Sequence, residues 1–156
     1  MATGQFHAMA RNSRTMSGIT PAQVFVALND GASYDQWVVG TRKIRDVDLG
    51  FPAPTTAVHY TVGYAPFRKD GRTVVKAIDP GRQIELEAKA WPAGTMRIGI
   101  TVEAVADGCD VIIKEHPLHG PAKVLHNPLL DLVIKARNVE TLRRLEKRVR
   151  ELARTA

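Results

Sequence analysis

Residues 128–152 form a long segment that no glycine or internal proline interrupts, and their apolar side chains recur at helical spacing. Asn127 can cap such a helix with its side-chain oxygen. Pro128 suits the first helical position because an N–H there would have no acceptor within the helix, so proline loses no hydrogen bond by lacking one. Asp131 places negative charge near the positive end of the helix dipole. The sequence therefore predicts one long C-terminal helix.

The apolar residues of this predicted helix do not follow one straight line. At about 100° per residue, those in its first half share one side, and those in its second half have rotated away from that side. The first set is Leu129, Leu132, Val133, Ala136 and Val139, and the second is Leu142, Leu145, Val149 and Leu152. A straight coiled-coil partner would not cover both sets. We therefore predict that a curved sheet wraps around the helix.

The residues before this helix predict strands and two short helices. Residues 11–16 alternate like a strand, Thr20 and Pro21 begin a helix over 19–28, and a second short helix is expected over 32–38. From residue 41 onward the hydrophobicity alternates with a period of two. The candidate strands are 42–48, 56–64, 72–78, 83–91, 95–106 and 110–116.

Short, turn-forming segments separate these strands, which predicts antiparallel neighbours. Asp107-Gly108 fits a tight hairpin that needs positive φ and would place the last two strands side by side. Ile84 and Leu86 alternate with Glu85 and Glu87, so we expect one face of the sheet to be apolar and buried and the other to be polar and exposed to solvent. The predicted fold class is α+β, a seven-stranded curved antiparallel sheet that grips the C-terminal helix, with two short helices after strand one. We expect a single domain over 1–156.

Composition and charge narrow the function classes. The chain has 44% hydrophobic residues, which suits one domain with a real core, and its N-terminus lacks the apolar run of a signal peptide. No run of 18 apolar residues is present, so we expect no transmembrane segment and a cytoplasmic location. The single Cys109 excludes an intramolecular disulfide and a thiolate zinc cluster.

The net charge of +6 does not by itself indicate nucleic-acid binding, because much of it lies in the C-terminal helix. Glu140 with Arg144 and Glu146 with Arg150 are i, i+4 pairs, as expected for a solvated helix face. No nucleic-acid partner is expected. Binding of the basic helix to an anionic surface or partner remains the alternative.

The order of these elements and several motifs resemble the START-like, helix-grip (SRPBCC-like) superfamily, in particular its bacterial polyketide cyclase/dehydrase and lipid-transport members. The motifs are ITPAQVF at 19–25, Asp30-Gly31, YDQW at 34–37, EHP at 115–117 and RNVETLRRL at 137–145. The resemblance implies a hydrophobic cavity between sheet and helix for a lipid, polyketide, sterol-like or other amphipathic molecule. It does not imply one reaction, because the superfamily contains carriers, cyclases and receptors.

Glu115 and Arg137 are the candidate catalytic residues. Glu115 shares strand parity with Val111 and Ile113, so it is a carboxylate on an otherwise apolar face, and Arg137 lies one turn after Val133 on the predicted helix. A buried carboxylate needs a partner, and a guanidinium can form a bidentate ion pair with it through two parallel hydrogen bonds. Three interpretations stay open, namely a structural ion pair, a ligand-polarising or acid/base role, and a solvated Glu115.

Large aromatic residues are candidates for the wall or entrance of the cavity. Trp37, Tyr60 and Trp91 each combine apolar area with one hydrogen-bonding group, although each could equally pack in the core. Tyr60 is favoured as a ligand contact because it shares parity with Val58 and Val62. The complete set of predicted ligand-binding residues is Trp37, Tyr60, Ile98, Ile100, Ile113, Glu115, Leu129, Val133 and Arg137.

Histidines between the last strand and the last helix do not predict a metal site. His116, His119 and His126 lie close in sequence and His59 could join them, but their spacing suits no helix-borne pair and no carboxylate triad accompanies them. No phosphate loop or nucleophile elbow is visible, so no metal and no cofactor is expected.

The sequence thus favours a binding protein for a hydrophobic or amphipathic small molecule. One alternative is a cyclase or dehydratase that uses the same cavity and places at least two titratable residues within reach of each other. The other is an interaction module that uses the basic helix. No oligomeric state is indicated.

Overall fold

A computed structural model describes residues 10–63, 66–90, 94–119 and 128–155. It confirms the predicted α+β class and the predicted order of elements. The elements are β1 (Ala10–Ser17), α1 (Pro21–Asn29), a 3-10 turn η1 (Gly31–Ser33), α2 (Tyr34–Trp37), β2 (Thr41–Val47), β3 (Ala57–Val62), β4 (Lys69–Asp79), β5 (Gln83–Ala90), β6 (Gly94–Val105), β7 (Gly108–His119) and α4 (Pro128–Thr155).

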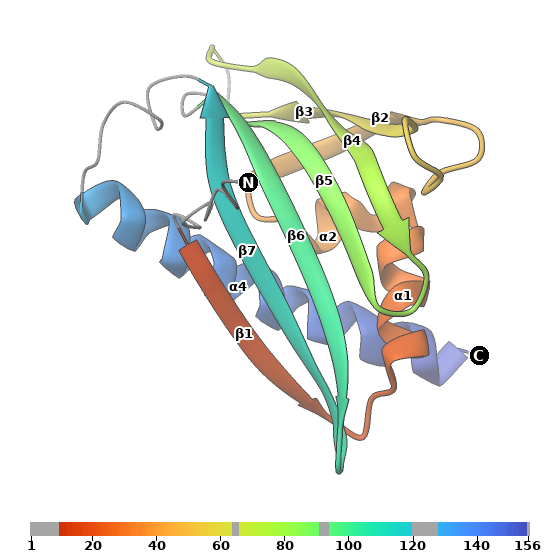
Figure 1. Ribbon diagram of the computed structural model, residues 1–156. Helices are drawn as coiled ribbons and strands as arrows, with labels where there is room; N and C mark the ends of the chain where they lie inside the picture. Colours follow the sequence, from red (N-terminus) through yellow and green to blue (C-terminus); the bar gives the residue numbers. More distant parts are fainter. Residues whose placement is uncertain (1–9, 64–65, 91–93, 120–127, 156) are drawn as a thin grey trace, which may run out of the picture.

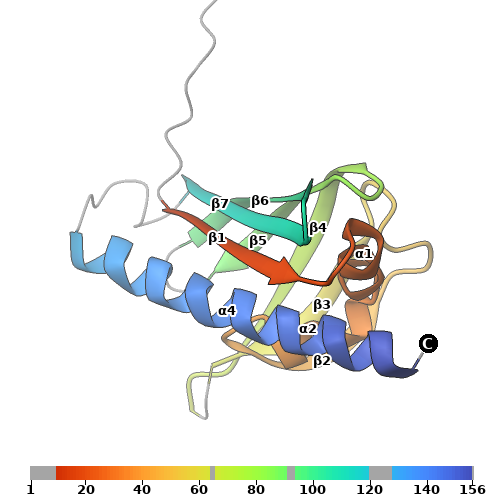
Figure 2. The same ribbon diagram turned by 90° about the horizontal axis from the view of Figure 1, so that it is seen from below.

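All seven strands form one antiparallel sheet in the order β1-β7-β6-β5-β4-β3-β2. The first two strands are therefore the two edges of the sheet, and α1, η1 and α2 connect one edge to the other. The sheet curls, and α4 runs along its open side next to β1, α1 and α2 (Figures 1 and 2). The strands in the middle of the sheet also face α4, but they lie farther from it than β1, α1 and α2 do.

The predicted start of the first helix is explained by a capping box. The Gln23 backbone N–H donates to Thr20 Oγ1 at 3.2 Å, and the Thr20 backbone N–H donates to Gln23 Oε1 at 2.9 Å. Pro21 occupies the first turn, where its missing N–H costs nothing. The second predicted helix begins with the 3-10 turn η1, so only Tyr34–Trp37 is α-helical.

The β6–β7 hairpin forms as predicted, but the reason given for its glycine is wrong. Gly108 is the first residue of β7 and does not have positive φ. Glycine is required there because a Cβ atom would lie 2.1 Å from the carbonyl oxygen of Met16 on the neighbouring β1. The close approach of residues 16–18 to the start of β7, and not the turn, excludes larger residues.

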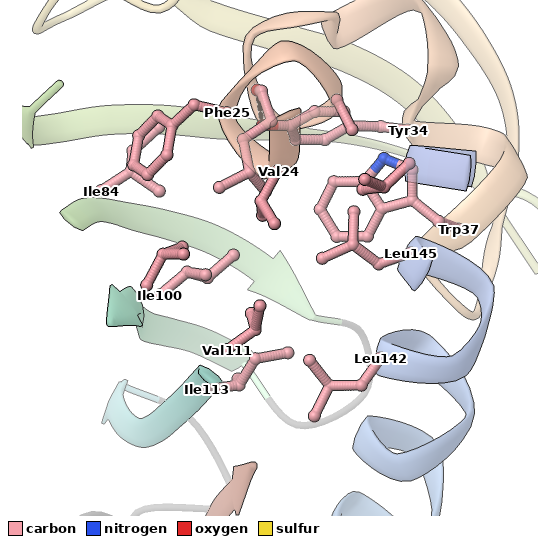
Figure 3. Packing of buried hydrophobic residues seen from close by; sticks show 14 of the residues in the cluster. Val24, Phe25, Tyr34, Trp37, Ile84, Ile100, Val111, Ile113, Leu142 and Leu145 are labelled. Carbon is pink, nitrogen blue, oxygen red and sulfur yellow. Dashed lines mark hydrogen bonds between the residues drawn. The ribbon is translucent and has the colours of Figure 1, made fainter. Parts of the chain in front are cut away.

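The packed core lies at the end of the molecule that holds α1 and α2. Figure 3 shows side chains from α1, α2, the sheet and the second half of α4 meeting there. From α4, the contributions are Leu142, Leu145 and Val149, each at most 1% exposed. These residues anchor α4 to the rest of the protein.

The first half of α4 does not turn its predicted apolar side inward, so that prediction is wrong. Leu129, Leu132, Val133 and Val139 are between 56% and 65% exposed. The buried positions are instead Ile134, Asn138 and Thr141, which continue the line of Leu142 and Leu145 along the helix. The physical reason is that two polar residues take inward positions, because they have hydrogen-bonding partners inside the protein.

Candidate functional site

A cavity of about 540 Å³ lies between the sheet and α4. Its walls come from β3 to β7, from α2 and the residues after it, and from the first half of α4. Most of its inner surface is apolar. Its polar groups come from Tyr34, Thr41, Tyr60, Thr73, Lys89, Glu115, Arg137, Asn138 and Thr141, and from the indole of Trp37. Among the described elements, α4 packs mainly against β1, α1 and α2, and the cavity is the space left between α4 and the other strands.

The cavity wall contains most of the residues predicted from the sequence. Those on it are Trp37, Tyr60, Ile98, Ile100, Ile113, Glu115, Val133 and Arg137. Leu129 is not among its lining residues and is 65% exposed, so its predicted place is corrected. Leu129 lies on the outer side of α4 for the reason given above, and Ile134 takes the inward position. Trp91 lies outside the described residues.

Tyr60 lies in the wall because its neighbour on β4 is a glycine. Tyr60 pairs with Gly71, and a Cβ atom on Gly71 would lie 2.8 Å from the tyrosine ring. The Tyr60 hydroxyl is 3.0 Å from Thr73 Oγ1, so the two buried hydroxyls satisfy each other. Burial raises the pKa of Tyr60, although the Thr73 hydrogen bond and the positive charge of Arg137 oppose the rise. The phenol therefore stays protonated at neutral pH.

Glu115 is a buried carboxylate held from α4. It is 3% exposed and pairs across the sheet with Ile98, which also lines the cavity. Asn138 Nδ2 donates to Glu115 Oε2 at 3.3 Å, and Arg137 Nη1 lies 3.7 Å from Glu115 Oε1. The two residues singled out in the sequence thus meet, and Asn138 is a partner that the sequence reasoning missed. Asn138 could have been found from the sequence, because it is next to Arg137 on the helix that was predicted to face Glu115.

A second set of contacts ties the segment after α2 to the same part of α4. Arg137 Nε donates to the Val39 carbonyl oxygen at 3.1 Å, and the Val39 backbone N–H donates to Thr141 Oγ1 at 3.3 Å. Val38, Val39 and Gly40 line the cavity, so these bonds hold one of its walls. No local pattern in the sequence indicates them, because the partners are about a hundred residues apart.

The histidines do not assemble in the described part of the chain. There, no group of three or more His, Cys, Asp or Glu side chains is placed to hold a metal ion. His59 Nε2 instead contacts Asp48 Oδ1 at 2.8 Å, and burial together with Arg97 lowers the pKa of His116. His126 and the side chain of His119 lie outside the described residues. That the protein uses no metal or cofactor stays a prediction.

The cavity combines apolar walls with a carboxylate, a guanidinium and a phenol, which suits an amphipathic molecule. A family model described as polyketide cyclase / dehydrase and lipid transport matches residues 8–150. The chain belongs to this family. The family explains the fold and the position of the cavity, whereas the chemistry depends on the residues in its wall. Among the described residues, no helix is long and apolar enough to cross a membrane.

Solved structures share the family fold at low sequence identity. Ara h 8.0201 is 16% identical with a TM-score of 0.70, and the match covers 91% of this chain and 97% of that one. The di-domain ARO/CYC protein StfQ from the steffimycin biosynthetic pathway is 12% identical with a TM-score of 0.68, over 92% of this chain and 51% of that one. Protein NE0264 from Nitrosomonas europaea is 13% identical with a TM-score of 0.69, over 94% and 96%. No curated protein matches the chain.

Proposed function

We propose that this chain is a cytoplasmic binding protein for a hydrophobic or amphipathic small molecule, such as a lipid, a polyketide or a sterol-like compound. The observation that carries the proposal is the cavity of about 540 Å³ with predominantly apolar walls. This volume is typical of small-molecule sites, which range from roughly 300 to 1,000 Å³. The family description, which includes lipid transport, is consistent with such a ligand.

The polar groups of the wall suggest where the polar end of a ligand binds. Arg137 has five N–H donors, more than its contacts with Val39 and Glu115 require. Its side chain is 32% exposed and lines the cavity near the Tyr60 hydroxyl, whose pKa it influences. A carbonyl, hydroxyl or acidic group of the ligand would be held there, while its apolar part contacts Ile98, Ile100 and Ile113.

A fluorescence titration with anilinonaphthalene sulfonate, which joins apolar rings to an anionic group, tests this proposal. We expect saturable binding that fatty acids displace. The Ile98→Trp variant fills the cavity and should weaken probe binding about tenfold or more, because the rings no longer fit. Val26→Trp on the exposed side of α1 is the control, since Val26 is 55% exposed and does not line the cavity. Equal probe binding by the two variants would contradict the proposal.

The second candidate is an enzyme of the cyclase or dehydratase type. It is favoured by the finding that three groups able to donate or accept protons or to polarise a ligand, on Tyr60, Glu115 and Arg137, line one cavity. In this alternative Glu115 accepts a proton from the ligand and Tyr60 donates one. Glu115→Gln would then abolish turnover of a polyketide-like substrate and leave probe binding intact. If Glu115→Gln keeps both substrate turnover and probe binding, the role of Glu115 is purely structural.

A further inference from the structure

The outer face of α4 carries an apolar patch in its first half. The patch consists of Leu129, Leu132, Val133, Ala136 and Val139, and its four large members are 56% to 65% exposed. At about 100° per residue, these positions lie opposite the buried Ile134, Asn138 and Thr141. A solvated helix face does not require exposed leucines and valines at this spacing, so the patch indicates a partner.

The same face becomes cationic in the second half of the helix. Five cationic residues and two carboxylates surround a shallow depression there, namely Arg14, Arg143, Lys147, Arg150 and Arg154 with Glu146 and Glu151. Lys147 and Arg154 are exposed, and no hydrogen bond or ion pair within the described residues is assigned to either. Figure 2 shows α4 running along one side of the molecule, so both halves of this face are open to the same flat partner.

We propose that the outer face of α4 binds the surface of an anionic lipid bilayer. Apolar side chains on one face of a helix insert at the boundary of headgroups and acyl chains, and lysine and arginine contact anionic headgroups. A bilayer supplies both chemistries without needing a matching groove. The i, i+4 ion pairs of this helix explain only part of its charge, and they do not explain the apolar half.

The outer face of α4 lies next to the cavity, so binding to a bilayer would serve the exchange of ligand with it. Val133 belongs both to the exposed patch and to the cavity wall, and Arg137 follows one turn later. A protein docked through this face would hold the rim of its cavity against the bilayer, so that a hydrophobic ligand could pass between them. This consequence rests on the proposed ligand binding, whereas the docking itself does not.

Co-sedimentation with vesicles tests the docking. Vesicles of phosphatidylcholine with about 30 mol % phosphatidylglycerol should bind the full chain, and vesicles of phosphatidylcholine alone should not. Lys147→Glu combined with Arg154→Glu should weaken partitioning about tenfold or more, and so should Leu129→Ser combined with Leu132→Ser. The charge control is Lys43→Glu with Lys114→Glu, and the apolar control is Phe67→Ser, all at exposed positions away from α4. Both controls should partition like the parent.

A tryptophan reporter fixes the orientation. Leu132→Trp should be quenched by brominated acyl chains in the anionic vesicles, and Val26→Trp on α1 should not. Four results would overturn the proposal: equal partitioning of parent and α4 variants, equal loss in the controls, equal binding to neutral and anionic vesicles, or quenching of both reporters. The other possible occupant of this face is a second copy of the chain, and sedimentation equilibrium tests for it. If the two serine substitutions dissociate a dimer and leave vesicle binding unchanged, this face is a self-association surface and the proposal is wrong. Failure of the probe titration above would leave these readouts unaffected.

Discussion

At the scale of single residues, Arg137 joins a buried carboxylate to the backbone of the segment after α2. Glu115 is 3% exposed, whereas the Arg137 side chain is 32% exposed and 3.7 Å from it. Asn138 also donates to Glu115, so loss of the arginine leaves the carboxylate with one partner among the residues that the structure describes. The pair is therefore less costly to break than a fully enclosed ion pair.

We expect Arg137→Ala to lower the free energy of unfolding by about 2 kcal/mol, because Glu115 loses a partner and the Val39 carbonyl loses a donor. Glu115→Gln combined with Arg137→Met should recover much of that loss, since no buried charge remains. Urea denaturation of Arg137→Ala, of Glu115→Gln and Arg137→Met singly, and of the double variant measures these free energies of unfolding. Additive effects of Glu115→Gln and Arg137→Met would mean that the two side chains are not coupled.

Glu146 is a second carboxylate, and its ion pair with Arg14 joins α4 to the sheet. Burial would raise its pKa, but hydrogen bonds from Arg14 on β1 and Arg150 on α4 outweigh burial and lower the pKa below its ordinary value of 4.5. A carboxyl group with a lowered folded pKa stabilises the protein above its unfolded pKa, and this stabilisation is lost as the pH falls through the folded pKa.

We therefore expect Glu146→Gln to destabilise the protein by about 1 kcal/mol at pH 7 and to have no effect once the pH lies below the folded pKa. Glu103→Gln is the control, since Glu103 is exposed on β6 and should behave like the parent at every pH. Thermal melts between pH 7 and strongly acidic pH give the comparison. A destabilisation that persists unchanged into acid would show that the charge of Glu146 is not its cause.

At the scale of elements, the rotation of α4 decides which leucines matter for folding. Leu145 is fully buried, and Leu132 is 64% exposed on the same helix. We expect Leu145→Ala to cost about 3 kcal/mol through lost burial and a residual cavity. Leu132→Ala should change stability by less than about 0.5 kcal/mol. Denaturant midpoints measure both, and similar costs would mean that the helix is rotated from the described position.

At the scale of the whole molecule, the cavity separates a tightly packed end from an open one. A ligand that binds only the folded protein stabilises it by about 2.7 kcal/mol at a hundred times its Kd. We expect anilinonaphthalene sulfonate at that excess to raise the Tm by roughly 5 to 10 °C for a domain of this size. The Ile98→Trp variant should show little rise. An equal rise in that variant would place the probe outside the cavity.

Local patterns in the sequence determined the elements and their order. The capping residues Thr20 and Pro21 begin α1, and alternation along the strands correctly places Tyr60, Ile98, Ile100 and Ile113 on one face of the sheet. Strand ends differ by up to three residues; β7, for example, runs to His119 where 116 was predicted. These features follow from residue periodicity and turn chemistry, which act over a few neighbouring residues.

Only the tertiary structure decided how α4 is rotated and therefore what the site contains. Counting apolar residues favoured Leu129 and Leu132 as inward positions, yet Asn138 and Thr141 are buried instead. They have partners, Glu115 on β7 and Val39 after α2, that lie far away in the sequence. The rotation of a helix depends on the burial and hydrogen bonding of its whole length against every element that it contacts. A local stripe of apolar residues contains no information about those partners.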